Sequence, residues 1–297
     1  MKKIVQALIV LTFSLTLFFV GCRKKETIEV DNESQSSVDN AVADQEYSGI
    51  VPAVQDHAIN TKGTGAIKGK LIAPCDSLTK ISGDTLFGTP NHVDPTYTMS
   101  ISNSGCISTM PDGRLRTGYL KVRLTGKIKN PGSKMIIKLI GYSVLMPISN
   151  TGNASVGYTC DSIVVTTLPS GLDTSISTKF NVKLINGVCL WGAGKTIKYS
   201  SDRTISVYPK GKPINTEPFT SVYGTANGVS RLGIAFSLNI PENSPMIKHK
   251  TCKWVDKGIL ELTPQGFKTR IVDFGDGTCD DKATFTVNGS KVAFTLN

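Results

Sequence analysis

The sequence has few of the residues that usually carry enzyme chemistry. Among 297 residues there are only 3 histidines and 2 tryptophans. His57, His92 and His249 share no metal-ligand spacing, and neither a His-Glu-x-x-His nor a Gly-x-Ser-x-Gly motif occurs. Nothing in the sequence selects a catalytic pair among the 23 acidic residues. We therefore predict that the chain is not an enzyme and that it needs no cofactor.

The chain also lacks a block of basic residues, although its formal net charge is +10. Lysine and arginine are instead spread along the whole sequence. Proteins that bind nucleic acid usually cluster these residues, so we expect no nucleic-acid partner. An excess of positive charge still attracts anionic surfaces and glycans weakly.

A long membrane-spanning run is absent as well. The apolar run from Ile4 to Val20 contains 17 residues, fewer than the roughly 20 that a bilayer-spanning helix needs. It follows two lysines and ends at Gly21-Cys22, which is the order of a secretory signal. We predict a signal peptide at residues 1–21. An uncleaved anchor, or an ordinary signal with an incidental cysteine, is the alternative.

The end of this leader points to lipid attachment. Phe19-Val20-Gly21-Cys22 resembles the lipobox of bacterial lipoproteins, which are cut before a cysteine that carries lipid, palmitate included. We therefore predict acylation of Cys22 and a membrane-tethered protein, since several acyl chains give stable anchoring. Residue 23 is Arg and not the Asp that resembles an inner-membrane retention signal. This favours the outer membrane, on its periplasmic or its cell-surface face.

The remaining six cysteines predict disulfide bonds, because an exported protein meets an oxidising environment. In an antiparallel hairpin, opposite residues have a constant index sum. A turn centred on Gln265-Gly266 pairs Cys252 with Cys279, and one centred on Pro90-Asn91 pairs Cys75 with Cys106. The third pair would be Cys160 and Cys189, but a hairpin signal at Asn186-Gly187 competes with it. The alternative is free, buried thiols.

Residues 22–62 form a polar segment rich in acidic residues, and we interpret it as the lipidated N-terminus followed by a stalk. Within it, Ser36 to His57 carries apolar residues near helical spacing. We therefore expect a short amphipathic helix here, packing on the domain or on a partner.

Residues 63–297 change to an alternating, period-two pattern that is typical of strands with one buried face. Leu120, Val122 and Leu124 alternate with polar residues, and the same pattern spans residues 232–240. Asn-Gly pairs at 186, 227 and 288 predict two-residue hairpin turns. The fold class we predict is all-β, an antiparallel hairpin-rich sheet domain, either a sandwich or a curled meander. A loose internal likeness also allows two repeated halves.

Several stretches together resemble a family of uncharacterised lipoproteins from Bacteroidetes. They are the lipobox, the stalk DNESQSSVDNAVADQEYSGI, the stretch around Asp112-Gly113-Arg114 and the block DFGDGTCDD at residues 273–281. The resemblance implies an envelope location and a β-rich fold, and it implies no chemistry.

Two candidate sites follow from local motifs. The carboxylates of Asp273, Asp276, Asp280 and Asp281 surround a glycine-rich turn and could ligate Ca²⁺, although their spacing is not that of an EF-hand. Ser77, Thr85 and Ser162 each follow an aspartate and precede an aliphatic residue, which resembles the O-glycosylation site of Bacteroidetes. The less specific interpretations are a strand end with a turn, and chance matches.

We accordingly predict an envelope-anchored lipoprotein with a non-catalytic binding or structural role. Its partners would be the membrane, through the lipid, and a glycan or another envelope protein. The alternatives are a hydrolase acting on glycan or peptide, and a periplasmic carrier of an apolar ligand. Trp191 and Trp254 could stack on sugars, but Trp254 lies two residues from Cys252 and so shares its face, which favours core packing against a disulfide.

Overall fold

A computed structural model of the chain describes residues 31, 33–59, 77–84, 86–100, 114–148, 152–213 and 216–295. The contacts divide the chain into two units, Met1–Asn32 and Glu33–Asn297. The expected leader, the lipidated Cys22 and the cysteines Cys75 and Cys106 lie outside the described residues.

The larger unit contains one long helix followed by a 15-stranded sheet. The helix is α2 (Gln35–Ile59). The strands are β1 (Ser77–Ser82), β2 (Thr96–Ser100), β3 (Leu115–Leu124), β4 (Lys134–Ile148), β5 (Gly152–Thr159), β6 (Ser162–Leu168), β7 (Thr178–Leu190), β8 (Thr196–Tyr208), β9 (Phe219–Val229), β10 (Ala235–Ile240), β11 (Met246–His249), β12 (Lys257–Pro264), β13 (Arg270–Asp276), β14 (Lys282–Val287) and β15 (Ser290–Thr295).

All strand pairs are antiparallel, and nearly every strand pairs with the next one in sequence. There are two departures. β5 does not pair with β6; instead, both strands pair with β4 and with β7. In the same way β10 does not pair with β11, and both pair with β9 and with β12. The predicted all-β, antiparallel class is therefore confirmed. Because there is one continuous sheet, the curled meander is the correct alternative and the sandwich is not.

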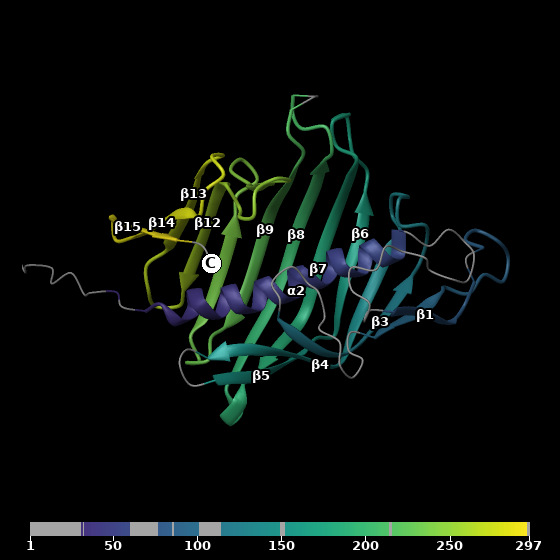
Figure 1. Ribbon diagram of the computed structural model, residues 1–297, viewed down its shortest axis with the longest axis horizontal. Coiled ribbons are helices and arrows are strands. Elements are labelled where there is room, and N and C mark those ends of the chain that lie inside the picture. Colours follow the sequence, from purple (N-terminus) through teal and green to yellow (C-terminus); the bar gives the residue numbers. More distant parts are fainter. Residues whose placement is uncertain are drawn as a thin grey trace, which may run out of the picture. The chain divides into compact units, whose positions relative to one another are not determined.

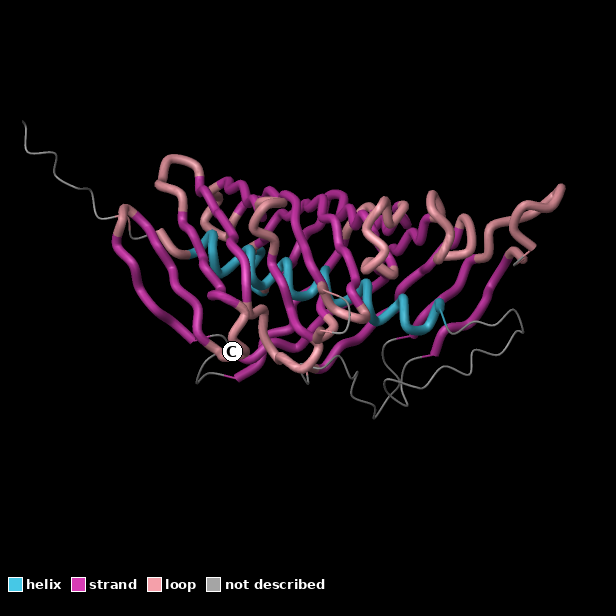
Figure 2. Tube along the Cα trace, turned by 90° about the horizontal axis from the view of Figure 1, so that it is seen from above, coloured by secondary structure: helices cyan, strands magenta, loops and turns pink. Residues whose placement is uncertain are grey.

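The sheet has one face that carries the helix and one that does not. Helix α2 lies across the strands on the first of these (Figure 1), and the strands at both ends of the sheet bend toward it (Figure 2). We call this the helix face and the opposite one the outer face. In β3, Leu120, Val122 and Leu124 are buried while the residues between them are exposed, as the alternating pattern predicts.

The hydrophobic core lies between α2 and the sheet. At its centre the ring of Tyr47, on the helix, packs edge to face on Tyr158 at 5.5 Å and parallel to Tyr199 at 6.4 Å. The Tyr47 hydroxyl donates hydrogen bonds to the carbonyls of Thr159 and Val188, so it anchors the helix to β5 and β7. Burial of these groups stabilises the sheet's curvature around the helix.

The helix expected within residues 36–57 is present and slightly longer. Its buried positions recur every three or four residues, but several of them are polar or charged, among them Ser36, Asp39 and Glu46. These residues make the segment look like a solvated stalk, yet they pack on the sheet. The structural unit therefore begins at Glu33, ahead of the boundary at residues 62 and 63 that the composition indicates.

The three Asn-Gly pairs have different structural roles. Asn288-Gly289 is a hairpin turn with positive φ at both residues, and it pairs Phe285 with Val292 as predicted. Asn186-Gly187 instead lies inside β7, where the register against β8 shifts, and Asn227-Gly228 lies inside β9. The last two hairpin predictions are wrong, because the flanking residues continue pairing with neighbouring strands through the Asn-Gly pair.

The disulfide predicted between Cys252 and Cys279 is present. Cys160 and Cys189 are free thiols, because the register of β5 and β7 places Cys189 opposite Tyr158 and not opposite Cys160. Burial raises the pKa of the Cys160 thiol to about 11 and also raises the pKa of Cys189. Both thiols are therefore protonated at neutral pH and are poor nucleophiles.

Candidate functional site

The outer face of the three central strands, β7, β8 and β9, carries the most extended polar surface that we find in the described part of the chain. Successive strand residues point to opposite faces. The Tyr199 hydroxyl donates a hydrogen bond to Asp44 of α2 at 2.7 Å, so Tyr199 points to the helix face. Its neighbours Lys198 and Ser200 consequently point away from the helix, onto the outer face.

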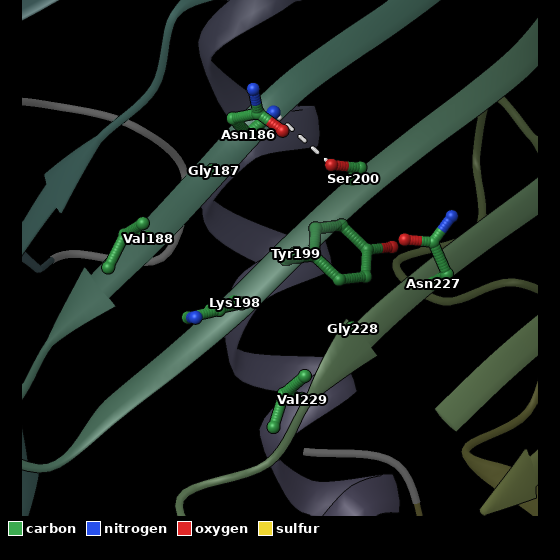
Figure 3. Close-up of a pocket in the computed structure, with 9 residues that line it drawn as sticks. All are labelled: Asn186, Gly187, Val188, Lys198, Tyr199, Ser200, Asn227, Gly228 and Val229. Atoms are coloured by element: carbon green, nitrogen blue, oxygen red, sulfur yellow. Dashed lines mark hydrogen bonds between the residues drawn. The ribbon is translucent and has the colours of Figure 1, made fainter. Parts of the chain in front are cut away.

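Two adjoining hollows lie on this outer face, with volumes of about 430 and 380 Å³. Both are lined by β7, β8 and β9, and they share Ser200 and Asn227. Figure 3 shows Asn186, Ser200 and Asn227 on three neighbouring strands, with α2 behind the sheet. The short Ser200 side chain on the middle strand forms the floor that the two hollows have in common.

The polar groups of the hollows are partly fixed by one another. The backbone N–H of Asn186 donates to Ser200 Oγ at 3.2 Å, and its side-chain amide donates to Asp161 at 2.6 Å. In the second hollow, Lys183 Nζ lies 3.0 Å from Asp202. Partial burial raises the pKa of Asp202, but hydrogen bonds from Asn181 and Lys183 outweigh it and lower the pKa overall. Asp202 is thus a fixed negative acceptor.

Other groups in the hollows are not engaged. The side chains of Lys198 and Asn227 are exposed, and they form no hydrogen bond or ion pair with any described residue. A lysine ammonium and a carboxamide together offer donors and an acceptor to a ligand. The hollows therefore combine ordered and available hydrogen-bonding groups.

The row of outward residues continues along the strands toward a third hollow, although the opposed pair Ser206 and Ser221 within it is buried. The residues of β8 on this face are Lys198, Ser200, Asp202, Thr204, Ser206 and Tyr208, and those opposite them on β9 are Val229, Asn227, Thr225, Tyr223, Ser221 and Phe219. At roughly 3.3 Å per residue, the ten steps from Lys198 to Tyr208 span about 33 Å. We call this row of paired side chains the polar strip.

The third hollow, of about 360 Å³, lies at the Tyr208 end of the strip. Tyr208 and Phe219 stack in parallel with their centroids 4.3 Å apart, and His249 packs on the far side of Phe219 at 5.6 Å. Lys248 and Lys250 also line this hollow. Because the rings cover one another's faces, a ligand here meets their edges and the lysines, not an open aromatic platform.

Two histidine–carboxylate pairs occur in the described residues. His249 Nδ1 lies 2.9 Å from the buried Asp256, beside the third hollow. His92 Nδ1 lies 2.6 Å from Asp84, and its Nε2 lies 3.4 Å from Asp94. The second pair joins the two ends of the loop between β1 and β2, so its geometry is that of a loop clasp. Neither pair was found from the sequence, because separations of eight residues (His92 and Asp84) and seven residues (His249 and Asp256) belong to none of the sequence motifs considered.

The Asp84 clasp predicts a measurable acid titration. The backbone N–H of Val93 and the ring of His92 both stabilise the carboxylate and lower its pKa to about 2. Its stabilising contribution is therefore complete above the unfolded-state value of about 3.9 and is lost as the pH falls through 2. We expect an NMR titration to give Asp84 a midpoint near pH 2. A midpoint near 4 would mean that the clasp does not form.

The structure does not bring the calcium candidates into a metal site. Asp273, Asp276 and Asp280 each accept a hydrogen bond from the backbone N–H two residues later, so each carboxylate closes its own turn. Among the residues described, no group of three or more His, Cys, Asp or Glu residues could hold a metal ion. Asp281 lies directly before β14.

The remaining sequence candidates do not line the outer-face hollows, although Ser162 lies directly opposite Ile185, which lines the second one. Ser162 begins β6 and Ser77 begins β1, while Thr85 is outside the described residues. Trp191 packs against the core beneath the guanidinium of Arg231, at 4.2 Å. Trp254 lies two residues from Cys252 and under Lys253. Neither indole forms an open sugar-stacking surface.

Comparisons of the chain with protein-family models, with curated protein sequences and with solved structures gave no match. The one helix of the described residues is not long and apolar enough to pass through a membrane.

Proposed function

We propose that this protein is a lipoprotein anchored through Cys22 in the cell envelope and that it is a non-catalytic receptor for a glycan chain. The chain would lie along the polar strip on the outer face of β8 and β9. The observation that carries the proposal is the pair of adjoining hollows that share Ser200 and Asn227.

The chemistry of the strip suits a polyhydroxylated ligand. Its side chains are mostly hydroxyls, carboxamides and single charges, which exchange hydrogen bonds with sugar hydroxyls. The strip is about 33 Å long by the strand rise, so it matches a chain of several sugars better than one small molecule. Lys198, Lys248 and Lys250 at its two ends add a preference for an acidic glycan.

A carrier of apolar ligands has less support. Such proteins hold their ligand in a largely apolar cavity, and here the middle of the helix face is occupied by α2. The helix side chains Ala43, Ile50 and Val54 are fully buried there. The hollows on the other face include the charged or polar side chains of Lys198, Asp202 and Asn227 in their linings.

A hydrolase is the second candidate, and the His249–Asp256 pair favours it. A buried carboxylate that fixes an imidazole at the edge of a hollow is the arrangement of a general base. We expect no turnover, because the carboxylate of Glu217, which lies near His249, is already held by the backbone N–H and hydroxyl of Thr251. Reducing-end assays on acidic and neutral oligosaccharides test this, and product formation that His249→Ala abolishes would establish the hydrolase instead.

If a glycan binds along the polar strip, a large side chain in place of Ser200 should weaken that binding strongly. Ser200→Tyr should weaken binding about tenfold or more, because the ring occupies both hollows while tyrosine remains favourable on a strand surface. Asn227→Ala should weaken it about two- to tenfold through loss of hydrogen bonds. The measurement is calorimetry with a panel of neutral and acidic hexasaccharides, using the mature chain with Cys22→Ser.

Matched controls lie elsewhere on the same sheet. Thr79→Tyr adds the same ring at an exposed position of β1, and Asn130→Ala removes an exposed amide in the turn between β3 and β4. Both should bind like the wild type. If no hexasaccharide binds, or if the control variants lose affinity as the strip variants do, the strip is only a solvated sheet surface.

A further inference from the structure

One end of the sheet gathers four turns that alternate with the strands from β7 to β15. They are residues 191–195, 230–234, 265–269 and 288–289, which join β7 to β8, β9 to β10, β12 to β13 and β14 to β15. In an antiparallel meander, every second connection lies at the same end. We call these four turns and the strand residues next to them the basic rim.

The charge of the basic rim has one sign. The segments 186–200, 227–238, 262–272 and 284–295 contain no aspartate or glutamate, and Lys195, Lys268 and Lys291 are exposed on them. Glu33, which precedes the helix, and Asp39, which lies on it, also reach this end, and their buried carboxylates are ion-paired with Arg270 and Arg231. The connections at the opposite end carry charges of both signs: Asp173, Glu217, Asp256, Asp280 and Asp281, together with Lys210, Lys212, Lys250 and Lys253.

The basic rim also exposes large apolar side chains. Leu232 is 65% exposed, Val292 58%, Leu190 46% and Phe267 40%. Each lies in a rim turn or within three residues of one. Apolar side chains set among lysines are the combination by which proteins bind the interface of an anionic bilayer. Four exposed apolar side chains at one end of a sheet indicate an interaction surface.

Glu33, where the larger structural unit begins, also lies at the basic rim. Arg270 Nη2, at the start of β13, donates to the backbone carbonyl of Glu33 at 2.6 Å, so Glu33 is held at the basic rim. Ten residues, 23–32, separate it from Cys22. Even fully extended, they reach no farther than about 36 Å. A lipid on Cys22 therefore keeps the basic rim close to the bilayer and raises the effective concentration of its lysines there.

We infer that the basic rim is a second membrane contact, which seats this end of the sheet on the anionic phosphate headgroups of the bilayer. The inference rests on the proposed lipid anchor at Cys22. Seated in this way, the strands stand up from the bilayer and the polar strip remains accessible from the side. The opposite end, with the disulfide and the His249–Asp256 pair, points away from the membrane.

Vesicle binding by the unlipidated mature chain, with Cys22→Ser, tests the inference without the anchor. We expect it to sediment with vesicles of phosphatidylglycerol and phosphatidylethanolamine, with affinity that falls as salt is raised, and not with phosphatidylcholine alone. The two tryptophans report the orientation. Trp191 belongs to the rim and Trp254 to the opposite end. Brominated lipids should quench Trp191 in the Trp254→Phe variant and leave Trp254 unquenched in Trp191→Phe.

A matched pair of triple variants separates the basic rim from general charge. Replacing Lys195, Lys268 and Lys291 with glutamate should weaken vesicle binding about tenfold or more. The same change at Lys210, Lys248 and Lys250, at the opposite end, should have little effect. The inference fails if anionic vesicles do not bind, if both triple variants lose binding equally, or if Trp254 is quenched as strongly as Trp191.

The outcomes also distinguish this inference from the proposed function. Mass spectrometry of the native N-terminus tests acylation of Cys22 by itself, and calorimetry with hexasaccharides tests the polar strip by itself. If vesicles bind the protein but the native Cys22 is not acylated, the basic rim is a membrane contact and the proposed lipid anchor is wrong. If Cys22 is acylated but the unlipidated chain binds no vesicles, the lipid anchor is correct and the basic rim is not a membrane contact.

Discussion

Replacing Glu46 with alanine is expected to lower the free energy of unfolding by about 3 to 5 kcal/mol. Glu46 lies on α2, and both of its carboxylate oxygens accept hydrogen bonds from Arg116 of β3, at 2.8 and 2.9 Å. The two side chains are 0% and 1% exposed. Without the carboxylate, the buried guanidinium loses both hydrogen bonds and the ion pair that Glu46 provides, and the Tyr142 hydroxyl loses the same acceptor.

Urea unfolding followed by circular dichroism measures this effect. Lys183→Ala is the matched control, because it breaks the exposed Lys183–Asp202 pair and should cost about 1 kcal/mol or less. The double variant Glu46→Leu with Arg116→Leu should be more stable than either single variant, since it buries no unpaired charge. A loss below about 1 kcal/mol in Glu46→Ala would show that α2 is not held by this pair.

The helix shows how far the sequence could lead. Its presence was predictable from the spacing of Tyr47, Ile50 and Val54, which are buried as expected. Its position on the sheet was not, because its acidic residues suggested a solvated stalk. Asp39, Asp44 and Glu46 pair with arginines from three distant strands or turns. Only knowledge of those contacts shows that the charges are buried.

The hairpin predictions were also correct at one Asn-Gly pair and wrong at another. Around Asn288-Gly289, the turn signal and the alternating pattern agree, and the predicted register is found. At Asn186-Gly187 the turn signal alone suggested a hairpin, but neighbouring strands on both sides maintain pairing through a bulge. A local signal therefore fails where long-range pairing is extensive.

The polar strip was not visible in the sequence, because any solvated strand face is polar. A signal does exist once the register is known. The outward residues of β8 and β9 are mainly serine, threonine, asparagine and aspartate, where a purely solvated face usually carries longer lysine and glutamate side chains. The acid-free segments of the basic rim can be found in the sequence, but only the topology places them at one end.

Loss of the disulfide is the second change with a large expected effect. Cys252 and Cys279 are 27 residues apart and join the loop before β12 to the loop before β14. Closing a loop of this length is worth about 3 to 4 kcal/mol by the chain-entropy estimate. We expect Cys252→Ser with Cys279→Ser to lower the free energy of unfolding by that amount, again measured in urea.

The change should also have a local consequence that separates it from a general loss of packing. Asp256 lies four residues after Cys252, and it holds the ring of His249 from the same loop. Without the bridge, this loop gains conformational freedom first, so amide exchange should rise at residues 250–256 before it rises in β8. Cys160→Ala, which removes a free thiol, should cost about 1 kcal/mol and leave that loop protected. If both variants lose the same free energy of unfolding, the disulfide contributes no more stability than a single buried thiol.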